Sequence, residues 1–164
     1  MRVIKLALIS VVVFALFITG FSLFFPSRVR ISKAIDINAP KKIIHPYLAD
    51  INNWRAWYPG ADTMTIIVEG GKTGLKNRTG GKISISNITD TTIITSTSGG
   101  GLKGSVSGWN LHQSGLPNTV TVQWYMDIKL RWYPWEKFSS MLLEKRYGPV
   151  MQVGLERLKE VVEK

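Results

Sequence analysis

The sequence predicts an α+β protein in which one C-terminal amphipathic helix covers an antiparallel sheet, preceded by a single N-terminal transmembrane helix. Three observations predict this fold class. Residues 6–25 carry no charged side chain, residues 63–132 alternate apolar and polar positions in short runs, and residues 149–163 repeat apolar side chains at helical spacing. The 164 residues suit one globular domain plus an extra N-terminal segment.

The uncharged segment 6–25 is long enough to cross a membrane, because a helix rises about 1.5 Å per residue and a bilayer core is about 30 Å thick. Arg2 and Lys5 ahead of it also resemble the start of a secretory signal. The apolar part of such a signal usually runs about 7–15 residues and ends at a small-residue cleavage site, whereas this segment ends in "GFSLFFPSRVR". We therefore expect an uncleaved anchor over residues 1–27 and a globular domain over residues 28–164, with a cleaved signal as the alternative.

The charges around this segment give a weak indication of orientation. Positive side chains stand on both sides of it, so the positive-inside rule does not decide which end faces the cytoplasm. They are Arg2, Lys5, Arg28, Arg30 and Lys33. The short basic N-terminus resembles a retained export signal, which slightly favours a single-pass protein of the cell membrane with its domain outside the cytoplasm.

The composition and charge of the chain limit the classes of partner that we expect it to bind. The formal net charge of +10 suits contact with anionic lipid headgroups, and an ordinary solvated basic surface is the alternative. The basic residues are scattered and accompany no recognition motif, so no nucleic-acid partner is expected, and no protein partner is indicated. Because the chain contains no cysteine, disulfides and thiol chemistry are excluded.

The globular domain begins with a strand. Val29, Ile31, Ile35 and Ile37 occupy alternate positions, which is the period of a half-buried strand, and Lys33 interrupts the pattern. One face of this strand is therefore expected to face the core.

Two short helices follow. Pro40 opens "KKIIHPYLAD", whose interior Pro46 lacks an N–H and should kink or divide the helix. The second helix is "NNWRAW", which ends before the Pro-Gly pair at 59–60 and concentrates Trp54 and Trp57 in a short segment.

Five short strands come next, in "TMTIIVE", "KTGLKN", "KISISNI", "TTIITSTS" and "LKGSVSGWNLH". Glycine-rich or Thr-Asp turns separate them, as in a meander of hairpins. Leu102 and Val106 share one parity while Trp109 and Leu111 take the other, so we expect a β-bulge at Gly108.

The clearest alternation lies in residues 120–132. A strand of this length must twist and curve around something. Its apolar positions are Val120, Val122, Trp124, Met126, Ile128, Leu130 and Trp132.

The closing helix supplies the partner for that curved strand. After the turn-like "YPWEKFSS", the pair Gly148-Pro149 sets the expected helix start. Gly154 in the interior either allows a close approach to the sheet or leaves space beneath the helix. The expected buried face consists of Met151, Leu155, Leu158 and Val162.

Two motifs resemble a known family. One is "INAP" at residues 37–40, which leads into His45-Pro46 and on to Trp54 and Trp57; the other runs over residues 148–159. With the order of elements, they resemble the START-like or SRPBCC superfamily, specifically its polyketide cyclase/dehydrase members with the birch-pollen-allergen-like fold.

The resemblance covers about residues 28–163 and implies a helix-grip fold. In that fold a curved seven-stranded antiparallel sheet surrounds the long C-terminal helix, and two short helices after the first strand close one end. Members typically use the enclosed gap for an apolar ligand such as a lipid, sterol or polyketide. His45 departs from the family, which usually has Trp or another large apolar residue there.

The resemblance and the apolar pattern together suggest which side chains line a cavity. The candidates are aromatic, aliphatic and Met side chains and one glycine, although Trp54 and Trp57 are also candidates for ordinary core packing. They are Trp54, Trp57, Trp109, Trp124, Met126, Ile128, Met151, Gly154, Leu155 and Leu158.

Catalytic chemistry has little support. His45 and His112 stand in no metal-binding motif, and the acidic residues are dispersed, so no catalytic residue, metal or cofactor is expected. Three functions stay open: membrane-tethered binding, transport or sensing of a hydrophobic small molecule or lipid; a cyclase- or dehydratase-type enzyme; and a protein-interaction domain with a filled cavity.

Overall fold

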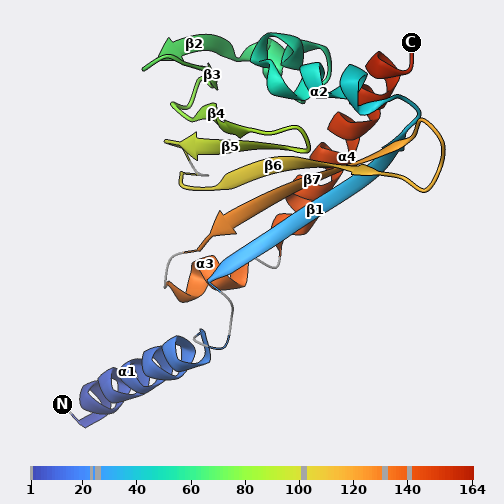
Figure 1. The fold of residues 1–164 in the computed structure, drawn as a ribbon. Coiled ribbons are helices and arrows are strands. Elements are labelled where there is room, and N and C mark those ends of the chain that lie inside the picture. Colours follow the sequence, from blue (N-terminus) through green and yellow to red (C-terminus); the bar gives the residue numbers. More distant parts are fainter. Residues whose placement is uncertain (1, 23, 25–26, 101–102, 131–132, 140–141) are drawn as a thin grey trace.

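The computed structural model describes residues 2–22, 24, 27–100, 103–130, 133–139 and 142–164, in which an N-terminal helix leads into an α+β domain (Figure 1). Helix α1 (Arg2–Ser22) has 21 residues, and its side chains are almost all exposed. By length and composition it is able to cross a membrane, a property that a secretory signal would share.

The domain is built on one antiparallel sheet of seven strands, as expected, in the order β1-β7-β6-β5-β4-β3-β2. Since β1 pairs with β7 along its whole length, from Arg28↔Lys129 to Ile37↔Val120, the first and last strands lie side by side. The strands are β1 (Arg28–Ile37), β2 (Thr65–Glu69), β3 (Lys72–Lys76), β4 (Lys82–Ile88), β5 (Thr92–Ser98), β6 (Val106–Gln113) and β7 (Val120–Lys129).

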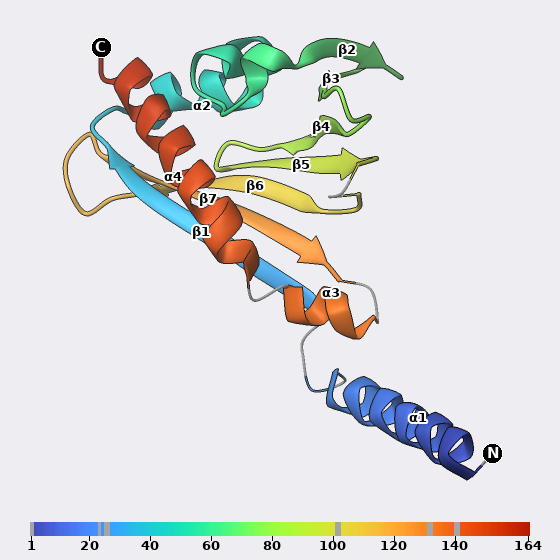
Figure 2. The ribbon, with the colours of Figure 1, turned by 180° about the vertical axis from the view of Figure 1, so that it is seen from behind.

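The long helix α4 (Leu143–Val162) lies across the inner face of this sheet, chiefly over β1 (Figure 2). The expected face is the buried one: Met151, Leu155, Leu158 and Val162 all belong to the core. The alternation in β7 is confirmed from Val120 to Ile128, because each of its even-numbered positions is buried. Trp132, the last position of that pattern, lies outside the described residues.

The connection from β1 to β2 holds the two expected short helices at the far end of α4 (Figure 1). Helix α2 (Lys41–Ala49) is not divided at Pro46, which removes only one backbone hydrogen bond from the helix. The second is the 3₁₀ helix η1 (Ile51–Ala56), capped by Asp50, whose Oδ1 accepts from the Asn52 N–H at 2.9 Å. A further short 3₁₀ turn, η2 (Ala61–Thr63), leads into β2.

The β-bulge expected at Gly108 is wrong. Pairing between β6 and β7 continues without a shift from Val106↔Asp127 to Gln113↔Val120, and the register shift lies in β4, between Ile85 and Asn87. Strand β6 starts at Val106, which lies on the same outer face of the sheet as Gly108. Leu102 lies outside the described residues. Gly108 instead allows the Tyr125 side chain to pack closely against the backbone, because a Cβ atom added at this position would lie 2.5 Å from Oη of Tyr125.

The expected start of the closing helix is also wrong. α4 begins at Leu143 and runs through Pro149, whose missing N–H leaves the Lys145 carbonyl without its helical donor. The turn-like segment before it contains another helix, α3 (Pro134–Ser139), which begins at a proline, a favoured first position because no N–H is needed there.

Candidate ligand-binding cavity

Five aromatic side chains gather where η1 meets the sheet and α4. The ring centres of Trp54 and Trp109 are 5.2 Å apart, those of Trp57 and Trp109 are 5.7 Å apart, and those of Trp109 and Trp124 are 5.3 Å apart. Tyr58 stacks on Trp54 at 4.9 Å. Edge-to-face and offset pairs of this kind each contribute about 0.5–1.5 kcal/mol beyond area burial, so this aromatic cluster stabilises the end of the domain.

Two of these tryptophans also tie η1 to α2. Trp54 Nε1 donates to the carbonyl of Leu48 at 3.0 Å, and Trp57 Nε1 donates to the carbonyl of Tyr47 at 2.9 Å. Both side chains are fully buried. The unusual aromatic content of "NNWRAW" is therefore used to pack the segment that closes the domain.

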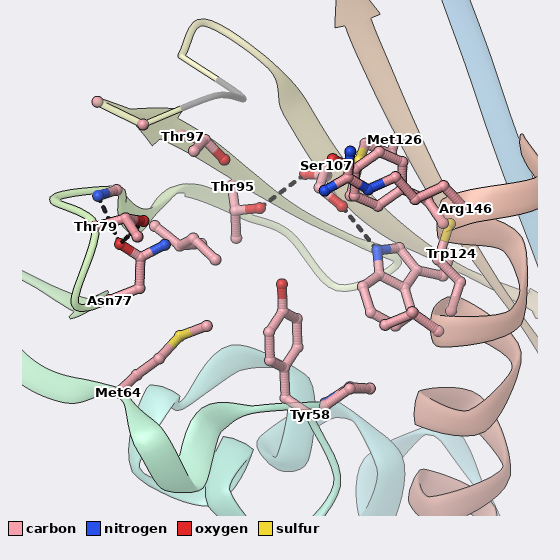
Figure 3. Close-up of a pocket in the computed structure, with 18 residues that line it drawn as sticks. Tyr58, Met64, Asn77, Thr79, Thr95, Thr97, Ser107, Trp124, Met126 and Arg146 are labelled. Atoms are coloured by element: carbon pink, nitrogen blue, oxygen red, sulfur yellow. Dashed lines mark hydrogen bonds between the residues drawn. The ribbon is translucent and has the colours of Figure 1, made fainter. Parts of the chain in front are cut away.

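A cavity of about 360 Å³ lies beside this cluster, between the first half of α4, the inner face of the sheet and the end of η1 (Figure 3). It is partly open to solvent, and its wall mixes apolar and polar side chains. The lining residues are Tyr58, Pro59, Met64, Asn77, Thr79, Gly81, Ile83, Thr95, Thr97, Gly99, Gly100, Ser107, Trp124, Met126, Arg146, Tyr147, Val150 and Met151.

Three of the residues singled out in the sequence line this cavity: Trp124, Met126 and Met151. The other seven do not belong to its lining. Trp54, Trp57, Trp109, Ile128, Leu155 and Leu158 are core side chains. Gly154 is the seventh, and it is buried within α4.

Gly154 marks the inner limit of the cavity. A Cβ atom there would lie 2.8 Å from Cζ3 of Trp124 and 2.9 Å from Cδ of Pro59. Of the two roles expected for this glycine, the structure shows the close approach. Trp124 and Pro59 therefore occupy the space beneath the helix, and the cavity continues only on the side of the N-terminal half of α4.

One polar part of the wall is held by its own hydrogen bonds. Ser107 Oγ donates to the Tyr125 carbonyl at 3.0 Å and accepts from Trp124 Nε1 at 2.7 Å. Thr95 Oγ1 donates to the Ser107 carbonyl at 3.1 Å (Figure 3). Because these groups are satisfied, they fix the Trp124 indole as a rigid wall.

Other polar groups face the cavity without a partner in the described part of the chain. They are the hydroxyl of Tyr58, the amide nitrogen of Asn77 and the hydroxyl of Thr97. The orientation of Asn77 is fixed, since its Oδ1 accepts from the Gly81 N–H at 2.7 Å and from Thr79 Oγ1 at 2.9 Å. These groups are free to bond a ligand.

Burial raises the pKa of Tyr58 to about 12. Tyr58 is half-buried, and its hydroxyl faces the cavity (Figure 3). The phenol therefore stays protonated across the physiological range and acts as a hydrogen-bond donor.

Arg146 supplies the only full charge at neutral pH among the described lining residues, and no carboxylate or imidazole accompanies it. Sequence reasoning missed Tyr58, Asn77, Thr97 and Arg146. Tyr58 stands directly after Trp57, so its place beside the aromatic segment was a signal that could have identified it. Arg146 was hidden because the helix was expected to begin after it.

Neither His45 nor His112 lines this cavity. His45 Nε2 is 3.0 Å from the Thr89 carbonyl, which links α2 to the turn between β4 and β5. Within the described residues there is no group of three or more His, Cys, Asp or Glu side chains that could hold a metal ion.

Solved structures share the fold at low sequence identity. A START superfamily protein from Mycobacterium smegmatis is 15% identical with a TM-score of 0.61, over 82% of this chain and 97% of that one. A norcoclaurine synthase from Thalictrum flavum, solved with a transition-state analogue, is 12% identical with a TM-score of 0.61, over 82% of this chain and 94% of that one.

The di-domain aromatase/cyclase BexL is 11% identical with a TM-score of 0.64, over 84% of this chain and 51% of that one. Among curated proteins there is no match to this sequence. A family model described as "Polyketide cyclase / dehydrase and lipid transport" matches residues 28–163, which include every strand and α4. The chain therefore has a START-like fold and belongs to the polyketide cyclase/dehydrase and lipid transport family.

Proposed function

We propose that this protein binds a hydrophobic or amphipathic small molecule in the cavity beside Trp124, and that α1 tethers this binding domain to a membrane. The cavity itself carries the proposal. Its volume of about 360 Å³ falls within the range of about 300–1,000 Å³ typical of ligand sites. Its wall combines apolar surface with a few polar groups that have no internal partner, as such sites usually do.

The chemistry of the wall favours binding over catalysis. A general base works best with a pKa near the operating pH, and the described lining residues include no histidine or carboxylate. Tyr58, with a pKa of about 12, donates a hydrogen bond instead of taking a proton. The wall is therefore suited to hold a ligand and to exclude water from its apolar part.

A cyclase-type role is the second candidate, and the free hydroxyl of Tyr58 is the observation that favours it. A protonated phenol facing the cavity could stabilise negative charge that develops on a carbonyl oxygen during ring closure. BexL, which shares the fold, is named an aromatase/cyclase, and norcoclaurine synthase, solved with a transition-state analogue, shares the fold too. The filled-cavity alternative has less support, because side chains leave this space open.

The proposed tether is supported by the position of the basic residues. Arg28, the first residue of β1, and Lys129, the last of β7, are cross-strand partners at the end of the sheet nearest α1 (Figure 1). Cations held close to the bilayer contribute about 1 kcal/mol each when they face anionic headgroups. The full chain should remain in membranes after a carbonate wash, while a chain lacking residues 1–26 should be soluble. Recovery of a mature protein that begins near residue 27 in a soluble fraction would contradict the tether.

Binding is tested by native mass spectrometry of the full chain released from detergent micelles, followed by organic extraction. We expect a bound molecule that is lost on extraction and that rebinds when the extract is returned. If only the unliganded mass is found, and if fatty acids, sterols and aromatic polyketides all fail to bind when added, the proposed function is wrong.

A further inference from the structure

Arg146 stands at the edge of the cavity without an acidic partner. Its Cζ lies 5.6 Å from the ring centre of Tyr147, a cation–π contact that orients the guanidinium, and its side chain is exposed. Figure 3 shows this side chain extending from α4 toward the strands of the opposite wall. No carboxylate forms an ion pair with it in the part of the chain that the structure describes.

The sequence of α4 explains why this cation is unpaired. On a helix, side chains interact with those three and four positions away, and for Arg146 these positions hold Leu142, Leu143, Pro149 and Val150. The nearby carboxylate of Glu144 is engaged elsewhere, since it accepts from Lys33 Nζ at 3.1 Å. The guanidinium therefore keeps its five donors available.

No negative charge among the described lining residues would repel an anion in the cavity. Its described lining residues include one cation, Arg146, and no acidic side chain. Neutral donors lie on the opposite wall, which the strands form, among them the amide nitrogen of Asn77 and the hydroxyl of Thr97 (Figure 3). Trp124, Met126 and Met151 supply apolar surface for the rest of a ligand.

We propose that Arg146 makes this cavity selective for amphipathic anions, with a carboxylate or phosphate head paired to the guanidinium and an apolar tail against Trp124. This inference rests on the proposed function and narrows its ligand class. Arg binds both heads well because its planar fork matches carboxylate and phosphate oxygens with two parallel hydrogen bonds. The net charge of +10 adds a long-range attraction for such ligands.

Three probes with the same tail separate head from tail: lauric acid, lauryl phosphate and lauryl alcohol. Each is titrated by calorimetry into the full chain held in an amphipol. We expect at least one of the anions to bind about tenfold more tightly than the alcohol. The anion that binds more tightly then shows whether the preferred head is a carboxylate or a phosphate. If both anions bind more tightly than the alcohol by the same factor, the cavity recognises anionic charge alone.

Variants on α4 then assign the effect to one side chain. Arg146→Gln should weaken binding of the preferred anion about tenfold and leave the alcohol unchanged, while Arg146→Lys should recover part of the loss because it keeps the charge. Arg157→Gln is the matched control, since Arg157 is exposed on the same helix but does not line the cavity. It should change none of the affinities.

Two results overturn the inference in different ways. If all three probes bind equally and Arg146→Gln changes none of them, the cavity is a ligand site without anion selectivity, and the proposed function stands alone. If none of the probes binds while the chain remains folded by circular dichroism, this inference fails, and the proposed function fails with it only when sterols and aromatic polyketides do not bind either.

Discussion

Gly154 of α4 lies against Trp124 of β7 so closely that a Cβ atom on the glycine would be 2.8 Å from Cζ3 of the indole. The helix and the sheet therefore meet without space at this point. The same contact positions the indole that Ser107 holds from the other side, through the 2.7 Å bond from Trp124 Nε1. The close approach at Gly154 thus forms the inner wall of the cavity.

Replacement of this glycine should destabilise the domain. In Gly154→Leu the added side chain has to displace Trp124 and Pro59, so we expect a loss of about 1–3 kcal/mol in the free energy of unfolding, as for other overpacked cores. The near-ultraviolet circular dichroism of the tryptophans measures it during denaturation. Gly115→Leu is the control, because no atom lies within 4 Å of the added Cβ. A Gly154→Leu variant as stable as the parent would show that space exists beneath the helix.

The outer face of the sheet has a second close approach, between Gly108 and Tyr125. A Cβ on Gly108 would meet the phenol at 2.5–2.8 Å, so Gly108→Ala should lower the free energy of unfolding by about 1–3 kcal/mol. The double variant with Tyr125→Ala should lose less than the sum of the two single variants, because the second change removes the clash. Purely additive losses in chemical denaturation would mean that the phenol does not occupy this space.

The ion pair on the outer face predicts a pH dependence of stability. Arg30 donates from Nε and Nη2 to the two carboxylate oxygens of Asp127, each at 2.6 Å, and this bonding holds the pKa of Asp127 below its ordinary value. A lowered folded-state pKa contributes stability above the unfolded pKa of about 3.9, and that stability is lost as the pH falls through the folded value.

Because the pair is largely exposed, Asp127→Asn should cost only about 0.2–1 kcal/mol at neutral pH. The difference from the parent should shrink as the pH falls below about 4. The exposed Asp62→Asn variant serves as control in the same denaturation series. A deficit that stays constant down to acidic pH would assign the effect of Asp127→Asn to something other than the ion pair.

Tyr58 should ionise later than an ordinary tyrosine. Its raised pKa means that burial stabilises the neutral phenol, so the associated stability is complete below an unfolded pKa of about 10 and is lost as the pH rises toward the folded value of about 12. Subtracting the tyrosinate absorbance of Tyr58→Phe from that of the parent isolates this group. A midpoint near 10 would show that water reaches the hydroxyl freely.

The sequence predicted best the elements with one buried face. In β7 a shift of one residue would move Trp124 and Met126 out of the core together, so the period of two was unambiguous. The same holds for Leu155 and Leu158 on α4, at helical spacing. The seven-stranded arrangement depended on the resemblance, because long-range pairing such as β1 with β7 leaves no local signal.

The cavity was harder to predict, for a physical reason. Thr97 and Asn77 look like solvent-facing residues in the sequence, since polar side chains in a cavity wall and on a surface give the same pattern. Large aromatics gave the opposite ambiguity: Trp54 was equally suited to the core and to a cavity rim, and only the fold places it in the core. Arg146 lay ahead of a proline that usually marks a helix start.

If the cavity beside Trp124 holds the ligand, filling this cavity should abolish ligand binding. Thr97 lines it from β5, whereas the neighbouring Ser98 points to the opposite, exposed face of the same strand. Native mass spectrometry of the full chain should show bound ligand in the parent and in Ser98→Trp, and an unliganded protein in a folded Thr97→Trp variant. Ligand retained by folded Thr97→Trp at the level of the parent would show that the ligand does not occupy this cavity.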